Sequence, residues 1–372
     1  MLETGLPAWT YKDPDFFALE REKIFRPGWQ IVCHESDVAE KGAYATLDFM
    51  GALAMVVRGK DGVLRAFKNV CRHRAARLLD EPFGACSSRI VCPYHAWTYD
   101  LDGRLVGVPG EAAYDEFDKG EYGLSSLELG SCGGFLFARM GEGGPSFEAF
   151  SAPLREDFAL YRTQEMRALG RITLRERKVN WKIAVENYVD KLHLPVAHDG
   201  LNGLVGDTYT LNVDGDVCRI EANVETLPHQ SLSVQAYRKL LPDTPHLPKE
   251  RRRQWLYVKL WPNLAFDIYP DQIDFMQFIP LAPDRTLLRE ISYALPDDRR
   301  EMRAARYLNW RINRVVNLED KDVIERVQAG LAGGDYEPGP ISRDEIALRD
   351  FAGRMRRELP VCRERVKPAA LS

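Results

Sequence analysis

Apolar residues change their spacing along the chain, and each change marks a different kind of element. Up to about residue 38 they recur at helical intervals, as in Phe16-Phe17-Ala18-Leu19, and Pro27-Gly28 interrupts the pattern. Between residues 44 and 140, short apolar runs such as 54–58 and 63–67 flank turn signals such as Lys60-Asp61-Gly62. We therefore predict a helical arm over residues 1–38 and an all-β domain over residues 39–150.

The rest of the chain, residues 151–372, combines both spacings. Helical spacing occurs over 175–192 and again over 300–331, where it stops at Gly333-Gly334. The segments between these helices that alternate as strands do are 219–224, 256–261, 273–278 and 286–293. A series of strands with a long helix predicts an α+β domain that contains an antiparallel sheet.

The composition is that of a globular protein with room for about two domains. Its 372 residues are 45% hydrophobic and 28% charged, and the net charge of -4 argues against nucleic acid as a partner. No apolar run is long enough to cross a membrane, and the acidic, aromatic N-terminus does not look like a signal peptide, so we interpret the protein as cytoplasmic. Seven cysteines, an odd number in a long chain, favour metal ligation over a disulfide scaffold.

Two loops of the predicted β domain each pair a cysteine with a histidine. They are Cys71-Arg72-His73 and Cys92-Pro93-Tyr94-His95. Two thiolates can hold one iron while two imidazoles hold the other, which is the ligation of a Rieske [2Fe–2S] centre. The alternative is a structural zinc site, but zinc fingers usually place like ligands together, whereas each loop here joins unlike ones. The pattern therefore favours the Rieske cluster.

A second candidate metal site lies in NWKIAVENYVDKLHLPVAH, residues 180–198. His193 and His198 offer two imidazoles, and Pro195 between them bends the chain so that both can reach one metal. Two histidines and one carboxylate, with positions left open, form the facial triad of non-haem Fe(II) oxygenases. The carboxylate has to come from elsewhere in the chain.

The long predicted helix supplies a candidate for that carboxylate. Its apolar stripe reads Leu308, Ile312, Val316, Val323, Val327 and Leu331. Asp320 lies within this stripe, and a buried carboxylate is costly unless it is paired or bound to a metal. Glu319 and Asp322 lie off the stripe, and we expect them to be solvated. The alternative is that two shorter helices meet here and Asp320 caps the second.

With CRH … CPYHAWTYDLDG and NWK … ENYVDKLHLPVAH in this order, the chain resembles the oxygenase (α) subunits of Rieske non-haem iron ring-hydroxylating oxygenases. The resemblance covers roughly residues 25–350. It implies a Rieske [2Fe–2S] domain over 39–150, a helix-grip (START/SRPBCC-like) catalytic domain over 151–372, and an arm, 1–38, that packs on the catalytic domain. It also implies the ligands: Cys71, His73, Cys92 and His95 for the cluster, and His193, His198 and Asp320 for the mononuclear iron.

By this resemblance the protein is the terminal oxygenase of a multicomponent system. An NAD(P)H-dependent reductase or ferredoxin would pass electrons to the cluster and on to the iron, which uses O₂ to oxidise an aromatic or other apolar small molecule. The expected reactions are dihydroxylation, monohydroxylation or oxidative O- or N-demethylation. A betaine-, choline- or carnitine-like quaternary amine is the alternative substrate, although many such relatives have glutamate at the position of Asp190.

Two readings from other classes compete with an oxygenase. A Rieske electron carrier would not need His193, His198 and Asp320 or a large second domain. A helix-grip ligand-binding protein would have lost the mononuclear iron. Iron content separates these readings, because the oxygenase should hold about three iron atoms per subunit and either rival about two.

Further residues are predicted around the two metal sites. Those expected to line the substrate pocket are Asn187, Leu194, Trp310, Asn313 and Val316, although Trp310 could equally be a core residue. A basic cluster near the Rieske loops, consisting of Lys68, Arg72, Arg74 and Arg77, could dock an acidic ferredoxin or flavoprotein, although some of these arginines could instead hold the loops together.

Asp190 and Asn187 are the predicted catalytic residues outside the ligand sets. Asp190 precedes His193 by three residues, so on a helix its carboxylate would face the same side and accept the second ring N–H of His193. The resemblance implies that this aspartate also bonds His95 of the partner subunit, because the two sites within one subunit would be too far apart for fast transfer. We therefore predict a homotrimer without a β subunit.

Overall fold

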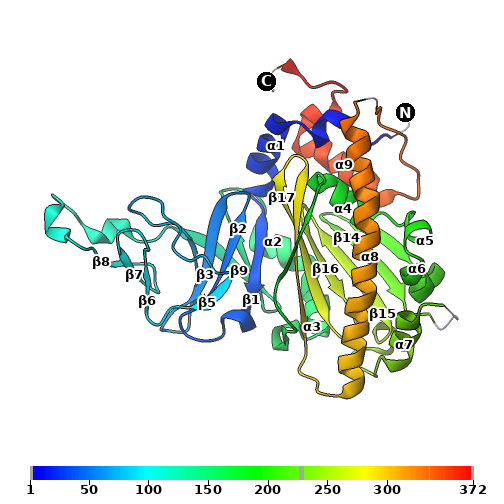
Figure 1. The fold of residues 1–372 in the computed structure, drawn as a ribbon, viewed down its shortest axis with the longest axis horizontal. Helices are drawn as coiled ribbons and strands as arrows, with labels where there is room; N and C mark the ends of the chain where they lie inside the picture. Colours follow the sequence, from blue (N-terminus) through cyan, green and yellow to red (C-terminus); the bar gives the residue numbers. More distant parts are fainter. Residues whose placement is uncertain (1–2, 226–229, 335, 370–372) are drawn as a thin grey trace. The chain divides into compact units, whose positions relative to one another are not determined.

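The computed structural model describes residues 3–225, 230–334 and 336–369, which form two compact units (Figure 1). The smaller unit is contiguous, Arg26–Arg167, and the larger one joins the described residues on either side of it. These boundaries differ from the predicted ones at 38 and 150. Strand β1 (Trp29–His34) pairs with β10 (Phe135–Arg139), and the Thr163 hydroxyl donates to the Gly133 carbonyl at 2.7 Å, so both flanking segments belong to the smaller unit.

The smaller unit contains two antiparallel sheets and two short α-helices. Its larger sheet has the order β1-β10-β9-β4-β3-β2-β5, and the smaller one has the order β6-β7-β8. The remaining elements are β2 (Ala43–Phe49), β3 (Ala52–Arg58), β4 (Leu64–Lys68), β5 (Phe83–Ala85), β6 (Arg89–Val91), β7 (Thr98–Asp100), β8 (Leu105–Gly107), β9 (Ser126–Cys132), α2 (Phe147–Ser151) and α3 (Arg155–Leu160). The sheets confirm the predicted β character of this region, and the two loops with cysteine and histidine follow β4 and β6.

The larger unit is built around one antiparallel sheet. From β18 its strand order is β18-β17-β16-β15-β14-β13, with β12 paired to β18. Its strands are β12 (Thr173–Arg177), β13 (Thr210–Asp214), β14 (Val217–Asn223), β15 (Gln254–Leu260), β16 (Leu264–Ile268), β17 (Ile273–Ala282) and β18 (Arg285–Ala294), and β11 (Arg167–Ala168) lies where the chain enters the unit. The predicted α+β class with an antiparallel sheet is confirmed.

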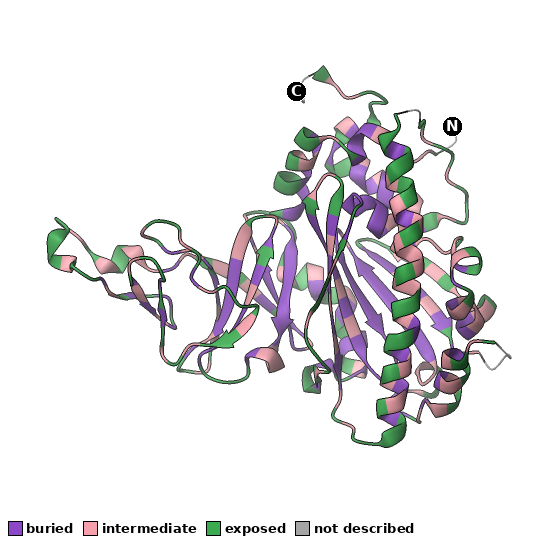
Figure 2. Cartoon of the chain, in the orientation of Figure 1, coloured by how far each residue is buried: buried purple, intermediate pink, exposed green. Residues whose placement is uncertain are grey.

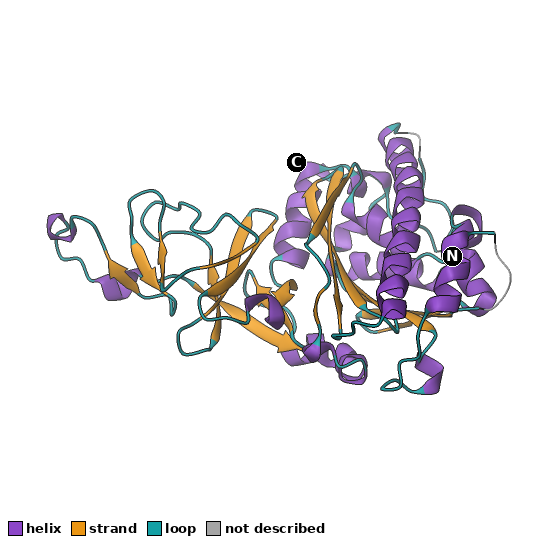
Figure 3. Ribbon diagram, turned by 60° about the horizontal axis from the view of Figure 1, so that its bottom comes forward, coloured by secondary structure: helices purple, strands orange, loops and turns teal. Residues whose placement is uncertain are grey.

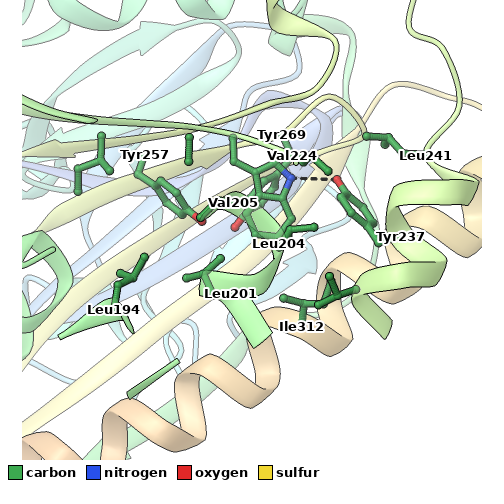
Figure 4. Packing of buried hydrophobic residues seen from close by; sticks show 14 of the residues in the cluster. Leu194, Leu201, Leu204, Val205, Val224, Tyr237, Leu241, Tyr257, Tyr269 and Ile312 are labelled. Atoms are coloured by element: carbon green, nitrogen blue, oxygen red, sulfur yellow. Dashed lines mark hydrogen bonds between the residues drawn. The ribbon is translucent and has the colours of Figure 1, made fainter. Parts of the chain in front are cut away.

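Helices of the larger unit gather along one face of this sheet (Figure 3). They are α4 (Trp181–Val189), α5 (Leu194–Ala197), α6 (Asp199–Val205), α7 (Leu232–Leu240), α8 (Arg300–Ala332) and α9 (Ile346–Glu358). The remaining α-helix, α1 (Pro14–Glu20), is joined to the start of α4 through Glu20. Leucines and valines of α5 and α6 pack with tyrosines of the sheet and with Ile312 of α8 (Figure 4). We call the sheet face under these helices the inner face. In the described part of the chain, no helix is both long and apolar enough to span a membrane.

Helix α8 is continuous over 33 residues, so the alternative of two shorter helices with Asp320 as a cap is wrong. Its outer side is exposed (Figure 2), whereas Ile312, Ile324 and Leu331 are buried. The predicted stripe fails at Val327, which is 46% exposed, whereas Ile324 beside it and Leu331 one turn further on are buried.

The helix predicted over 175–192 is shorter than expected. Residues Thr173–Arg177 form strand β12, and the helix begins only after Asn180, whose side chain accepts a hydrogen bond from the Lys182 amide. It ends at Val189. The N-terminal arm packs against this helix: the Lys182 ammonium lies 2.6 Å from the Glu20 carboxylate, and both side chains are fully buried.

Candidate metal centres

Three side chains from two helical regions meet in the larger unit. His193 and His198 flank the short helix α5, and Asp320 reaches them from α8. The Nε2 atoms of the two histidines lie 3.1 Å apart, and Oδ1 of Asp320 lies 3.0 Å from His198 Nε2 and 3.5 Å from His193 Nε2. All three candidate ligand atoms lie within 4.8 Å of one another. Two imidazoles and one carboxylate at this spacing fit a facial triad around one iron ion.

A carboxylate orients each of the two histidine rings. Asp190 Oδ2 lies 2.9 Å from His193 Nδ1, and Glu319 Oε2 lies 2.9 Å from His198 Nδ1. The expectation that Glu319 is solvated is therefore wrong, because a 100° step along α8 still lets its longer side chain reach the buried His198. Such bonds fix the ring orientation and leave Nε2 free for a metal.

Charge in this site favours cations. Burial by itself would lower the pKa of His193, but the hydrogen-bonded carboxylates of Asp190 and Asp320 raise it to about 9. Burial opposes ionisation of Asp320, but the two histidines and the Asn187 amide, which donates to Oδ1 at 2.7 Å, hold the pKa of this carboxyl well below its usual range. A positive ion in place of the protons would therefore be stabilised by the same carboxylates.

The predicted continuous helix through Asp190 and His193 is wrong, although the contact between the two side chains is present. The chain leaves α4 at Val189, and Asp190 has an extended backbone, with a carboxylate that accepts from the Leu192 amide at 2.9 Å. Pro195 lies in the first turn of α5, where it causes no loss of a helical hydrogen bond, so the two histidines converge because a short helix begins between them.

The cysteine and histidine loops of the smaller unit have matching geometry. The Ala75 amide donates to the Cys71 carbonyl and the Ala96 amide donates to the Cys92 carbonyl, each at 3.1 Å. Ala75 and Ala96 both have left-handed backbones, with φ of 56° and 54°. Each loop therefore folds back on its cysteine in the same way.

The four candidate ligands of these loops fit a [2Fe–2S] cluster. Burial raises the pKa of the Cys71 thiol, and the neighbouring Cys92 thiol raises it further. The His73 and His95 rings have centroids 4.7 Å apart, and the Nδ1 atom of each is buried without a hydrogen-bond partner among the described residues. Buried ring nitrogens are rarely left unsatisfied, so two of them beside two thiols fit the donor set of a Rieske [2Fe–2S] cluster.

The four basic residues predicted to dock a partner differ in what they contact. Lys68, Arg72, Arg74 and Arg77 are all exposed. Arg77 donates to the Asp48 carboxylate at 2.7 Å, and Arg74 lies over the Tyr94 ring with its Cζ 5.6 Å from the centroid. Arg77 therefore contacts another part of the smaller unit, as expected if it holds the loop in place instead of docking a partner.

Four of the five predicted pocket residues face the interior of the larger unit. Asn187 contacts Asp320, Leu194 is buried, Val316 packs against the same core, and Asn313 donates to the Tyr269 hydroxyl at 3.0 Å. Trp310 occupies neither a pocket position nor a core position. It is 46% exposed and lies beside Tyr307 and Arg314 on the outer side of α8, so the structure supports neither a pocket nor a core role.

Sequence reasoning missed a group of polar residues on the inner face. Asp267 on β16 and Asp274 on β17 are directly opposed in the sheet, and Tyr257 on β15 is opposed to Asp267. Both aspartates lie in mainly apolar strands, and the strand pairing places them on the same sheet face as Tyr257. A carboxylate within a mainly apolar strand was the signal available in the sequence.

A β unit with paired cysteine and histidine loops, together with an α+β unit carrying two histidines and an aspartate, defines a Rieske-type non-haem iron oxygenase. Comparison with protein families agrees: residues 28–118 match the Rieske [2Fe–2S] domain, and residues 163–360 match the ring hydroxylating alpha subunit catalytic domain. The chain belongs to the family of ring-hydroxylating oxygenase α subunits, which resolves the zinc alternative in favour of the Rieske cluster.

Several proteins similar to this chain are named as oxygenases of quaternary amines. The glycine betaine monooxygenase oxygenase subunit of Chromohalobacter salexigens is 30% identical and aligns with 93% of this chain and 84% of its own length. The quaternary ammonium Rieske monooxygenase CntA in complex with L-carnitine superposes with a TM-score of 0.80 at 25% identity, covering 96% of each chain. Another solved structure of a quaternary ammonium Rieske monooxygenase has a TM-score of 0.82 at 24% identity and the same coverage. That structure was used to study carnitine oxidation and electron transfer between subunits.

Proposed function

We propose that this terminal Rieske oxygenase is a monooxygenase of small quaternary or protonated amines. The observation that carries the proposal is the opposed pair Asp267 and Asp274 on the inner face. Directly opposed side chains of an antiparallel pair have Cβ atoms about 5 Å apart, so two ionised carboxylates there repel each other. A cationic substrate would relieve this repulsion, whereas a neutral ring would not.

The hydrogen bonds of the pair come from neutral groups. Tyr188 donates to Asp267 at 2.5 Å, and Gln272 donates to Asp274 at 2.9 Å. Burial raises the pKa of Asp267 to about 6 and that of Asp274 to about 8, and for Asp274 the charge of Asp267 contributes to the shift. Near neutral pH the pair therefore holds about one proton and one negative charge.

The nearby cations already have other partners. The Arg175 guanidinium, which lies within electrostatic reach of Asp274, is paired with Glu290. Arg306 donates to the main-chain carbonyls of Asp271 and Leu295. Among the described residues, no lysine or arginine lies within 4 Å of the Asp267 or Asp274 carboxylates. The negative charge of the pair is thus available to a ligand.

Aromatic rings surround the pair. Tyr188 and Tyr257 meet edge to face with centroids 6.4 Å apart, and Trp255 and Tyr269 meet in the same way at 4.6 Å. Faces of such rings attract quaternary ammonium groups, by about 0.5–2 kcal/mol for each well-placed ring. Tyr188 and Asp274 retain accessible surface although they lie between the sheet and the helices, which is expected if substrate has access to them.

Within this proposal His193, His198 and Asp320 hold the mononuclear iron, and Cys71, His73, Cys92 and His95 hold the cluster. The iron supplies O₂ activation with electrons that the family receives from a partner reductase or ferredoxin. The chain itself orients the site: Asp190 and Glu319 hold the two imidazoles by their Nδ1 atoms, and Asn187 holds the Asp320 carboxylate. One oxygen atom would enter a C–H bond beside nitrogen, and the other would leave as water.

We further propose a homotrimer without a β subunit. Asp190 binds His193 and keeps about a fifth of its side chain exposed, so a second donor can still reach it. His95 of the partner subunit is the expected donor. Such a contact joins two different surfaces and can close into a ring.

The substrate proposal can be tested by binding without turnover. Titration calorimetry should compare tetramethylammonium with neutral neopentyl alcohol of similar shape. The wild type should prefer the cation, and Asp267→Asn should weaken cation binding about tenfold or more while leaving the alcohol unchanged. The matched control is Asp271→Asn, which removes an equally buried carboxylate that binds Tyr237 instead.

The pH dependence gives a second reading of the same pair. Both carboxyls have raised pKa values, so the pair gains negative charge as the pH rises from about 6 to about 8, and cation affinity should increase over that range. A wild type that binds the alcohol as well as the cation, or a flat pH profile, would return the substrate to the aromatic and apolar class. Mass spectrometry of products with a reductase then identifies the compound.

A further inference from the structure

A recess on the inner face is lined by charged groups that sum to zero. It encloses about 290 Å³, including space open to solvent, between β14, β15 and α9. Its charged residues are Lys259, Arg354, Asp216 and Asp350, and Arg354 is paired with Asp216. Two cations and two anions leave no net charge, so the recess suits a neutral ligand better than an ion. Its volume lies just below the usual range for sites of drug-sized ligands, so that ligand would have few atoms.

Lys259 lies in this recess without an anionic partner of its own. The residue is 6% exposed. No hydrogen bond or ion pair joins its ammonium to any residue that the structure describes. The ammonium instead lies 5.2 and 5.4 Å from the ring centroids of Trp261 and Phe351. Buried lysines are almost always paired, so one that faces a recess and two aromatic rings is a candidate for chemistry.

The surroundings of Lys259 favour its unprotonated form. Burial is the main cause that lowers the pKa of Lys259, to about 8, and the charge of Arg354 acts in the same direction. Cys218, opposite Lys259 on β14, and the carboxylates of Asp350 and Asp216 oppose the shift. At pH 7 roughly a tenth of Lys259 is therefore an uncharged amine, against less than about a thousandth of an ordinary lysine. Uncharged amines are nucleophiles, and lysines are activated in this way by an apolar pocket or by a neighbouring cation.

We propose that Lys259 is a nucleophilic lysine that forms a reversible imine with a small aldehyde in this recess. The unprotonated amine attacks the carbonyl carbon, and a C=N bond forms while the C–O bond breaks. The carbonyl oxygen leaves as water with both amine hydrogens, so the step needs no oxidant or reductant. Water reverses it and releases the aldehyde.

The source of the aldehyde rests on the proposed function. A hydroxyl group on a carbon beside nitrogen makes the C–N bond break. The nitrogen then leaves with the electron pair, the hydroxyl group loses its proton, and the carbon departs as an aldehyde. Every turnover of an amine by this route would therefore release one small, neutral and reactive molecule.

The recess adjoins the region where such an aldehyde would form. Tyr257 and Lys259 are two residues apart on β15, so they share the inner face about 6.7 Å apart, and Asp267 is opposed to Tyr257. Val189, the last residue of α4, lines the same recess. The amine is thus close to the proposed ammonium site and to the helix that precedes the candidate iron ligands.

The first test adds acetaldehyde and cyanoborohydride to the purified holoenzyme at pH 7. Cyanoborohydride reduces an imine to a stable secondary amine, which peptide mass spectrometry locates. Lys259 should be ethylated about tenfold or more faster than the exposed Lys60 and Lys239 in the same sample, because far more of it is unprotonated. Arg354→Met should reduce this preference several-fold. Arg349→Met, which changes an arginine of the same helix outside the recess, should leave it unchanged.

A wild-type measurement covers the case in which Arg354→Met does not fold. The ratio of labelling rates at Lys259 and Lys60 cancels the pH dependence of the reagents. The ratio should stay constant below about pH 8 and fall by about tenfold per pH unit above it, because only Lys259 is then fully deprotonated. Labelling of Lys259 that is slower than that of Lys60, or a ratio that is the same at pH 7 and pH 9.5, would make Lys259 a structural residue and overturn the inference.

A turnover experiment separates this inference from the proposed function. The holoenzyme receives a reductase, O₂ and glycine betaine with ¹³C-labelled methyl groups, and cyanoborohydride is present throughout. Labelled carbon should accumulate on Lys259 ahead of Lys60. Labelled aldehyde in solution without preferential labelling of Lys259 would overturn the inference and leave the proposed function intact. No aldehyde from the amine, with acetaldehyde still labelling Lys259 first, would contradict the proposed function and confirm the nucleophilic lysine.

Discussion

The two candidate metal centres differ in how far apart their candidate ligands lie in the sequence. The candidate cluster ligands come from two short loops of one contiguous unit, and each loop contains a complete cysteine and histidine pair. The candidate iron ligands are split between the two ends of α5 and helix α8, and His198 and Asp320 are 122 positions apart. A site made of local segments can be recognised from spacing alone, whereas a site assembled by the fold depends on helices that must first be placed correctly.

The largest expected effect separates the two centres. His193→Ala removes one of three proposed ligands from the iron site and leaves the cluster loops untouched, so turnover should be lost completely while the red-brown Rieske spectrum remains. Iron analysis should fall from about three to about two atoms per subunit. Loss of the visible spectrum from a folded variant would show that the ligand sets are not separate.

The mononuclear iron site can also be tested by comparing substitutions of two nearby carboxylates on α8. Asp320→Ala should abolish activity, because its Oδ1 lies 3.0 Å from His198 Nε2. Asp322→Ala should retain most activity, because that residue is exposed two positions further on. Steady-state kinetics with a saturating reductase compares them, and similar losses in both would refute the assignment of Asp320.

Asp190 tests whether the two centres communicate between subunits. Asp190→Asn should keep both metals and the proposed trimer, yet slow reoxidation of the reduced cluster by about 10- to 100-fold in single-turnover experiments with O₂ and substrate. The reason is loss of the charged acceptor that contacts His193 Nδ1. Wild-type rates in this variant, or a fully active monomer by light scattering, would contradict the proposed link.

The smallest expected effect concerns electron entry at the cluster. Arg72→Gln should slow reduction by the partner several-fold at low salt and reduce its dependence on ionic strength, as steering by exposed charge requires. Arg77→Gln should change the rate less, because Asp48 already neutralises that side chain. Stopped-flow reduction over a range of salt concentrations measures both. Identical behaviour of the two variants would remove this distinction.

What could be predicted from the sequence follows the same division. The apolar patterns predict the β unit and the antiparallel sheet, the ligand spacing predicts both metal motifs, and a carboxylate within an apolar stripe predicts Asp320. The helix before His193 was overextended because Thr173–Arg177 carries no mark of its pairing with β18. The Asp267–Asp274 pair and the contact of Glu319 with His198 depend on strand register and side-chain reach, which spacing along one element does not contain.

The arm at the start of the chain bears on how the enzyme is synthesised. Glu20 leaves the ribosome early, but its partner Lys182 follows only after the whole smaller unit has been translated. The smaller unit is therefore complete, and able to receive its cluster, before the sheet of the larger unit exists. A recombinant fragment starting at residue 168 would leave Lys182 buried without its counter-charge, which typically costs about 3–5 kcal/mol. The larger unit, which contains the candidate mononuclear iron site, is thus poorly suited to expression on its own.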